Sequence, residues 1–288
     1  MVPIIVAIKV LKELGLIDYL AVPLTPIMEL VGLPSQTGLV WAASIANGLY
    51  SGILVYTALI PDMPTISVAQ ITVLATILLI AHNIPVEVRI TQQCGVGIWS
   101  QLVLRFGGAL ICGVMLHLIF SRWNLLSEPA VILWQVKAPA DPSWLTWAMG
   151  EGRNLLSIFV IIFILMTVMR LLNYFHITDL FNRLLQPILR LMGIGKEAAT
   201  ITIIGLTMGI AYGGGLIIHE AHRGKMKQHD IFAAVSLMGL SHALIEDSLL
   251  MSLLGASLYG ILFARLLFSL VVVAGLTRFV ARLGNRGG

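Results

Sequence analysis

The chain has 288 residues, of which 58% are hydrophobic and only 11% are charged. Soluble domains are about 45–50% apolar and about 25% charged, so this composition excludes a disordered chain, a nucleic-acid binder and an ordinary soluble enzyme. No polar stretch is long enough to be a soluble domain beside a single anchor. The sequence therefore predicts an all-α integral membrane protein, in which the net charge of +4 reflects Lys and Arg in cytoplasmic loops.

Eight apolar stretches follow one another along the chain. They are 3–20, 39–60, 67–91 and 97–120, and then 154–177, 199–219, 230–251 and 256–277. Between the two sets lies a segment with four of the six tryptophans, which favours a position at the membrane interface. We predict repeat 1 over 1–122, an interfacial connector over 123–150 and repeat 2 over 151–288.

The second set of stretches repeats the first. Residues match at an offset of 161, which slips to 160 further along the chain. The matched pairs include Gly48 with Gly209, His82 with His242 and Arg105 with Arg265. A drift of one residue over a whole half is hard to obtain by chance, so an internal repeat is indicated.

The distribution of Lys and Arg predicts that the two repeats are inverted. Stretches 18–38 and 60–66 of repeat 1 contain neither residue. Their counterparts in repeat 2 contain Arg183, Arg190, Lys196, Arg223, Lys225 and Lys227. Positive residues mark the cytoplasmic side, so equivalent loops fall on opposite sides, as in many secondary transporters. Both termini are expected in the cytoplasm, and the protein in the cytoplasmic (inner) membrane with several passes.

Inversion requires an odd number of crossings, so one of the four stretches in each repeat does not cross. The second stretch is the best candidate, because glycines interrupt it at 48–52 and 209–215. Gly in a helix interior costs about 1 kcal/mol, whereas the tip of a re-entrant hairpin accommodates it. The alternative is a Gly-rich crossing helix packed closely on its neighbours. We expect three crossing helices, a re-entrant hairpin and a broken helix in each repeat; the first crossing, 3–20, is short and charged.

The third stretch of each repeat carries polar residues near the membrane midplane. His82 lies about 15 residues into its stretch and His242 about 12 into its own, at about 1.5 Å per residue. Pro85 lacks a backbone donor and disfavours helix at Ile84, so the helix is predicted to break here. A broken helix exposes carbonyls and amides that bind ions and polar solutes.

Carboxylates accompany these histidines. A charge at the bilayer centre costs about 2.5–3.5 kcal/mol, so such a cluster marks a functional site by default. We predict that Glu87, Glu246 and Asp247 bind a coupling cation or proton, and that His82 and His242 relay protons or contact the solute. Further candidate solute contacts are Asn83, Gln92, Tyr50 and Tyr212.

Two arginines near mid-depth, Arg105 and Arg265, are candidate charge partners. They either contact a substrate or form structural ion pairs with Glu87 and Asp247. No metal site is predicted, because His219-Glu220-Ala221-His222 lacks the i, i+4 histidine pair of a zinc hydrolase. No nucleophile–base pair or nucleotide-binding loop is present, so an enzyme is not expected.

The motifs resemble those of the nucleoside-recognition, or Gate-domain, membrane proteins. Relatives of this kind include spore maturation proteins A and B and the gate regions of concentrative nucleoside transporters and of the ferrous iron transporter B. The residues that carry the resemblance are 48–52, 82–87, 211–215 and 241–248, so it extends over both repeats. The resemblance implies a core of hairpins and broken helices like that of a concentrative transporter, and it leaves the substrate open.

The leading hypothesis is a secondary active transporter that moves a small polar solute, for example a nucleoside-like molecule, through a midplane site between the repeats, coupled to H⁺ or Na⁺. No other cofactor is expected. One alternative is a divalent metal permease with His82, Glu87, His242 and Asp247 as ligands. Another is a membrane scaffold or regulatory subunit of a larger complex. The expected partners are the lipid bilayer and the solute, with a homo-oligomer or a partner subunit left open and no nucleic acid.

Overall fold

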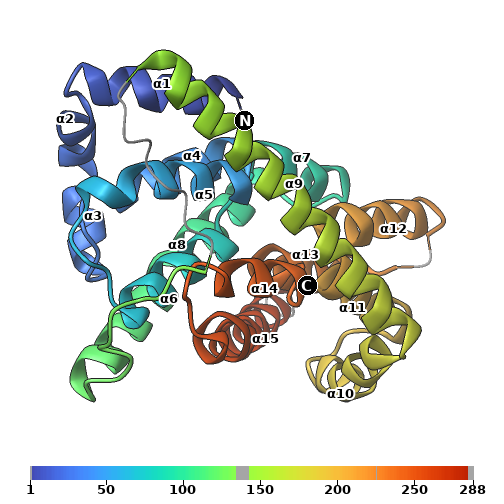
Figure 1. Cartoon of the computed structure of the whole chain (residues 1–288). Coiled ribbons are helices and arrows are strands. Elements are labelled where there is room, and N and C mark those ends of the chain that lie inside the picture. Colours follow the sequence, from blue (N-terminus) through green and yellow to red (C-terminus); the bar gives the residue numbers. More distant parts are fainter. Residues whose placement is uncertain (1, 134–142, 225, 285–288) are drawn as a thin grey trace.

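The protein folds into a set of packed helices (Figure 1), and the described part of the chain contains no strand. The computed structural model describes residues 2–133, 143–224 and 226–284. Trp134, one of the four connector tryptophans, lies outside these ranges. The predicted all-α class is confirmed.

The described residues of the first half form α-helices in the order in which the sequence places its apolar stretches. They are α1 (Val2–Glu13), α2 (Ile17–Ala21), α3 (Thr25–Leu30), α4 (Thr37–Asn47), α5 (Leu49–Leu59), α6 (Val68–Ile80), α7 (Ile84–Gln93) and α8 (Ile98–Arg122).

The second half repeats this order with fewer, longer helices at its start. They are α9 (Trp144–Tyr174), α10 (Ile177–Leu191), α11 (Lys196–Met208), α12 (Ile210–His222), α13 (Gln228–Ser241), α14 (Glu246–Ser252), the π-helical turn η3 (Tyr259–Ala264) and α15 (Arg265–Gly284).

Four helical segments among the described residues are long and apolar enough to cross a membrane. They are Ile98–Arg122, Trp144–Tyr174, Gln228–Ser252 and Tyr259–Phe279. A fifth is formed by α6 and α7 together, which are bent by 41° at their junction. This finding confirms a multi-pass membrane protein.

Helix α1 is too short to be the third crossing helix of the first half. Its 12 residues rise about 18 Å, against a hydrocarbon thickness of about 30 Å. Its charged side chains form partly exposed ion pairs instead. Lys9 pairs with Glu13 at 3.1 Å, and Lys12 pairs with Asp62 at 2.6 Å. Three crossing helices are therefore present only in the second half of the described chain.

Both Gly-rich stretches fold as two short antiparallel arms. Helices α4 and α5 meet at Gly48 (φ +89°, ψ 174°), and α11 and α12 meet at Gly209 (φ +98°, ψ 161°). These backbone angles are accessible almost only to glycine. The arms of each pair pack against one another, as a re-entrant hairpin requires. An uninterrupted Gly-rich crossing helix is excluded at both places.

Both third stretches break where their histidines lie. Asn83 (φ +46°) separates α6 from α7, and Ala243 (φ +45°) separates α13 from α14. The backbone amide freed at each break donates to the first arm of the hairpin in its own half. Asn83 N–H donates to the Ser44 carbonyl at 2.9 Å, and Leu244 N–H donates to the Leu206 carbonyl at 2.7 Å.

The two halves thus share the order of their elements and the positions of their left-handed residues. Gly95 (φ +88°) and Gly255 (φ +91°) add a further matched pair before α8 and η3. The opposite membrane orientation of the halves stays a prediction, as do their boundaries.

Helix α9 begins at Trp144, ten residues earlier than the apolar stretch 154–177 indicated. Ser143 caps it by accepting a hydrogen bond from the Thr146 amide, so the helix starts inside the expected connector. Trp144 and Trp147 pack edge to face in its first turn, and the Lys9 ammonium lies 5.7 and 5.9 Å from their ring centroids. The amino end of α9 is therefore held beside α1 (Figure 1).

Candidate functional site

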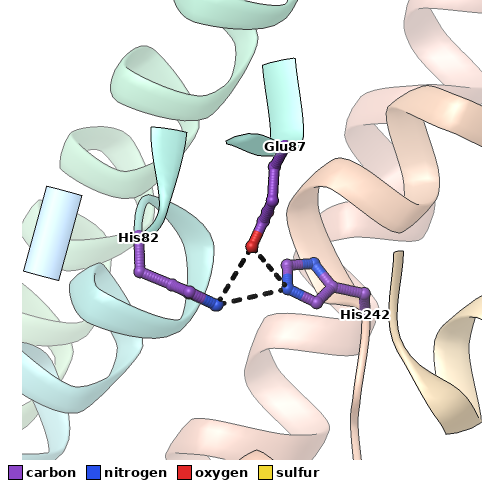
Figure 2. A group of neighbouring side chains, drawn as sticks. All are labelled: His82, Glu87 and His242. Atoms are coloured by element: carbon purple, nitrogen blue, oxygen red, sulfur yellow. Dashed lines mark hydrogen bonds and ion pairs between the residues drawn. The ribbon is translucent and has the colours of Figure 1, made fainter. Parts of the chain in front are cut away.

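The two broken helices meet at the centre of the molecule, where a histidine from each half faces a glutamate. His82 lies two residues beyond the end of α6, Glu87 lies in the first turn of α7, and His242 directly follows the last residue of α13. Figure 2 shows the three side chains pointing toward one another. They are only 6%, 3% and 3% exposed, respectively. His82 and His242, which the sequence matches through the internal repeat, are thus in contact in the structure.

Three atoms form the centre of this site, and we refer to them as the His–Glu triangle. They are Nε2 of His82, Nε2 of His242 and Oε1 of Glu87. The two nitrogens are 3.3 Å apart, and the oxygen lies 3.3 Å from the first and 3.5 Å from the second. So small a triangle has room for an ion and none for an organic solute.

The tautomer of each histidine is set by the helix that carries it. Nδ1 of His82 lies 2.9 Å from the Leu78 carbonyl, and Nδ1 of His242 lies 2.9 Å from the Met238 carbonyl. A carbonyl oxygen only accepts, so each Nδ1 carries a proton and donates it. Each neutral ring then presents a lone pair at Nε2. The His–Glu triangle is therefore a convergence of three acceptors, which requires a positive ion or a proton between them.

Arg105 connects the glutamate to the break in the first half. Its Nη1 lies 2.6 Å from Oε2 of Glu87, while Nε and Nη2 donate to the carbonyls of Ile80 and His82 at 3.0 Å each. These carbonyls lack helical partners because the helix ends there. The fully buried guanidinium thus supplies hydrogen-bond donors to the carbonyls at the helix break and neutralises the charge of Glu87. The structural ion pair considered from sequence is present in this half.

The equivalent pair in the second half is not formed. Asp247 occupies the position of Glu87, and its shorter side chain makes no ion pair with Arg265 among the described residues. Nη2 of Arg265 donates to the His242 carbonyl at 3.4 Å, but its buried Nε and Nη1 have no hydrogen-bond partner in that part of the chain. The site is therefore asymmetric although the sequence motif is repeated.

A half-buried polar rim adjoins the triangle. Asn83, Glu246, Asp247 and Tyr50 are all partly exposed. Asn83 lies beside Gly48 at the tip of the first hairpin, and Glu246 and Asp247 lie in the first turn of α14, directly after the second break. These four sequence-predicted residues lie next to the two breaks or the first hairpin tip in the chain.

Two sequence-predicted residues lie elsewhere. Tyr212 is 63% exposed on α12, although Tyr50, near the tip of the other hairpin, lies at the rim. Gln92 is hydrogen-bonded to Arg89 near the end of α7, about one and a half helical turns beyond Glu87. Neither side chain contacts the His–Glu triangle.

Sequence reasoning missed two residues that hold the first break in place. The Trp41 indole on α4 donates to the Ala81 carbonyl at 3.1 Å, and the Ser44 carbonyl accepts from Asn83. A buried indole N–H needs an acceptor, so a tryptophan within an apolar hairpin arm was a usable signal for Trp41. A backbone acceptor such as that of Ser44 carries no sequence signal.

Comparison with known proteins matches one part of the chain to a family. Residues 155–277 match the model of the Gate family, described as nucleoside recognition. The second half of the chain is therefore similar to Gate domains over most of its length. The resemblance seen in the sequence motifs is thereby confirmed for the half that carries His242, Asp247 and Arg265. The match does not extend to the half with His82 and Glu87.

A relative of the whole chain is also a membrane protein. The chain is 26% identical over 267 residues to the uncharacterized membrane protein YvoD of Bacillus subtilis, covering 91% of this chain and 83% of that protein. No solved structure matches. The similarity to the Gate family indicates a function related to membrane transport.

Proposed function

We propose that the protein is a secondary active transporter that moves a small polar solute through a site between its two halves, coupled to protons. The observation that carries this proposal is the meeting of the two broken helices. Each break brings a buried histidine to the centre, and the two Nε2 atoms are 3.3 Å apart across the halves. Broken helices with polar residues at mid-depth are the binding elements of many secondary transporters.

The chemistry of the His–Glu triangle favours H⁺ over Na⁺ as the coupling ion. Two of its three atoms are imidazole nitrogens, whereas hard cations prefer oxygen ligands. A proton on either Nε2 would be shared with the other nitrogen and with Glu87. A neutral imidazole can accept a proton at its free nitrogen and release it again. Proton entry and release would therefore alter the attraction between the two halves.

The solute would bind at the polar rim. Asn83, Glu246, Asp247 and Tyr50 supply amide, carboxylate and hydroxyl groups that suit the hydroxyls and amides of a nucleoside-like molecule. Asp247 and Glu246 lie on the element that directly follows His242. Solute binding at the rim and protonation of His242 are thus linked through a single short segment.

The test is flux into proteoliposomes that carry a pH-sensitive dye inside. The first probes are uridine and adenosine, followed by amino acids and small carboxylates. We expect one class of solute to accumulate with the proton gradient. His242→Gln should lower this accumulation by about tenfold or more, the size of a typical coupling between two sites.

The matched control is His117→Gln, because His117 lies on α8 beside Ser121 rather than in the triangle. Accumulation in this variant should equal that of the wild type. Accumulation that survives His242→Gln unchanged would contradict the proposed role of the triangle. Absence of flux with every probe would favour the alternative of a scaffold or regulatory subunit.

A further inference from the structure

We propose that the His–Glu triangle is a binding site for a first-row divalent transition-metal ion, held by Nε2 of His82, Nε2 of His242 and Oε1 of Glu87. The sequence offers these three residues as metal ligands only through the alternative of a metal permease, because no spacing motif links histidines that are 160 residues apart. The site shares its atoms with the proposed proton pathway, but metal binding is measurable on purified protein without any flux.

The dimensions of the triangle fit a coordinated ion. Bonds of about 2.0–2.1 Å from a tetrahedral Zn²⁺ to nitrogen and oxygen place neighbouring ligand atoms about 3.4 Å apart. The three observed separations are 3.3, 3.3 and 3.5 Å. A charge-assisted hydrogen bond between imidazolium and carboxylate would be shorter, at about 2.7–2.9 Å.

The groups behind the ligands also fit a metal. A histidine that binds a metal donates its other ring N–H to a carbonyl or carboxylate, which orients the ring and fixes the tautomer. Both histidines do so, through the carbonyls of Leu78 and Met238. The second oxygen of Glu87 is held by Arg105. All three ligands are therefore oriented before an ion arrives.

The donor set selects the class of ion. Two imidazoles and one carboxylate suit Zn²⁺, Fe²⁺ or Co²⁺, whereas Mg²⁺ and Ca²⁺ require mainly oxygen. Arg105 already balances Glu87, so the ion adds positive charge to a buried site. Asp247, in the first turn of α14, supplies a further carboxyl group five residues after His242. Three protein ligands leave a coordination position open for water or another group.

An ion at this position would join the two halves. His82 and Glu87 belong to the first half and His242 to the second, and all three are buried. Bound metal would therefore hold the broken helices together and exclude the shared proton. We expect Zn²⁺ to raise the unfolding temperature and to compete with protons.

The test begins with protein purified in detergent and stripped with a chelator. Isothermal titration and metal analysis should give one Zn²⁺ per chain near neutral pH, with no binding of Mg²⁺. His242→Gln and His82→Gln should each weaken Zn²⁺ binding by about tenfold or more, while His117→Gln should leave it unchanged. Zn²⁺ affinity that is the same in wild type and both ligand variants would overturn the proposal.

Co²⁺ provides a measurement that needs no variant. Bound to wild-type protein at a four-coordinate site with nitrogen ligands, Co²⁺ absorbs much more strongly in the visible than aqueous Co²⁺, and Zn²⁺ should displace that signal. A spectrum like that of aqueous Co²⁺ would also overturn the proposal. If the protein moves solute but binds no metal, the proposed function stands and the metal site is overturned. If the protein binds metal but moves no solute, the metal site stands and the proposed function is overturned.

Discussion

At the scale of single residues, the decisive feature is how the buried arginines are neutralised. Arg105 is in contact with Glu87 at 2.6 Å, whereas Arg265 has two buried nitrogens without a hydrogen-bond partner among the described residues. The two sites differ by one methylene, since Asp247 stands where the first half has Glu87. The first half thus contains a formed ion pair, whereas the corresponding arginine and carboxylate of the second half are not paired in the described part of the chain.

This difference predicts unequal effects of neutralising the two carboxylates. Glu87→Gln leaves the fully buried Arg105 charge unpaired, and loss of one partner of a buried ion pair costs about 3–5 kcal/mol. Asp247→Asn removes a charge that makes no ion pair and should cost about 1 kcal/mol or less. The free energy of unfolding in a detergent titration measures both. Equal losses would show that Asp247 and Arg265 are paired in the native protein.

At the scale of elements, the hairpins depend on one glycine each. Gly48 and Gly209 combine a positive φ with an extended ψ. The space around them is not the constraint. A side-chain carbon added at Gly48 would lie 3.9 Å or more from its nearest neighbours, which belong to Asn83, and one added at Gly209 would have no atom within 4 Å. The backbone conformation alone therefore requires glycine at each tip.

Alanine at either tip should accordingly destabilise the protein. The conformation is nearly exclusive to glycine, and the expected cost is about 1–3 kcal/mol for each of Gly48→Ala and Gly209→Ala. Gly107→Ala is the matched control, since Gly107 is helical in α8 and has open space around it. That change should stabilise by about 0.5–1 kcal/mol. Thermal unfolding of the three variants compares them, and tip variants as stable as Gly107→Ala would refute the argument.

At the scale of the whole molecule, the two halves are interlocked as well as similar. Helix α13 packs on both α6 and α8, and α12 packs on α7. The Ser257 amide donates to the Thr72 hydroxyl at 2.8 Å across the halves. Any movement that opens the central site must therefore separate several contacts between the halves together.

The predicted inversion of the halves has a direct test. Asp62 and Arg223 occupy equivalent positions after the two hairpins and are both exposed. In a background with Cys94 and Cys112 replaced by Ala, Asp62→Cys should react with a membrane-impermeant thiol reagent from outside the cell. Arg223→Cys should react only after the membrane is permeabilised, because Lys and Arg mark its side as cytoplasmic. Labelling of both from the same side would contradict inversion.

Local chemistry in the sequence was sufficient to predict several features. The membrane class follows from composition, the hairpin tips from glycines that a helix resists, and the first break from Pro85, because each depends on neighbouring residues alone. The same reasoning grouped His82, Glu87 and His242, which the structure brings into contact. It also placed Tyr212 with Tyr50, although Tyr212 is 63% exposed and Tyr50 is half-buried, because repeat symmetry relates backbones more closely than it relates side-chain surroundings.

Only the tertiary structure decided which atoms meet at the centre. The contact between His82 and His242, the pairing of Glu87 with Arg105 and the unpaired nitrogens of Arg265 all depend on how two halves pack. Composition and residue spacing do not determine the distances between side chains of the two packed halves. The sequence by itself determined a membrane protein in which a helix break with polar residues occurs twice. The tertiary structure determined that the two breaks form a single centre of the size of an ion, because the distance between side chains depends on how the halves pack.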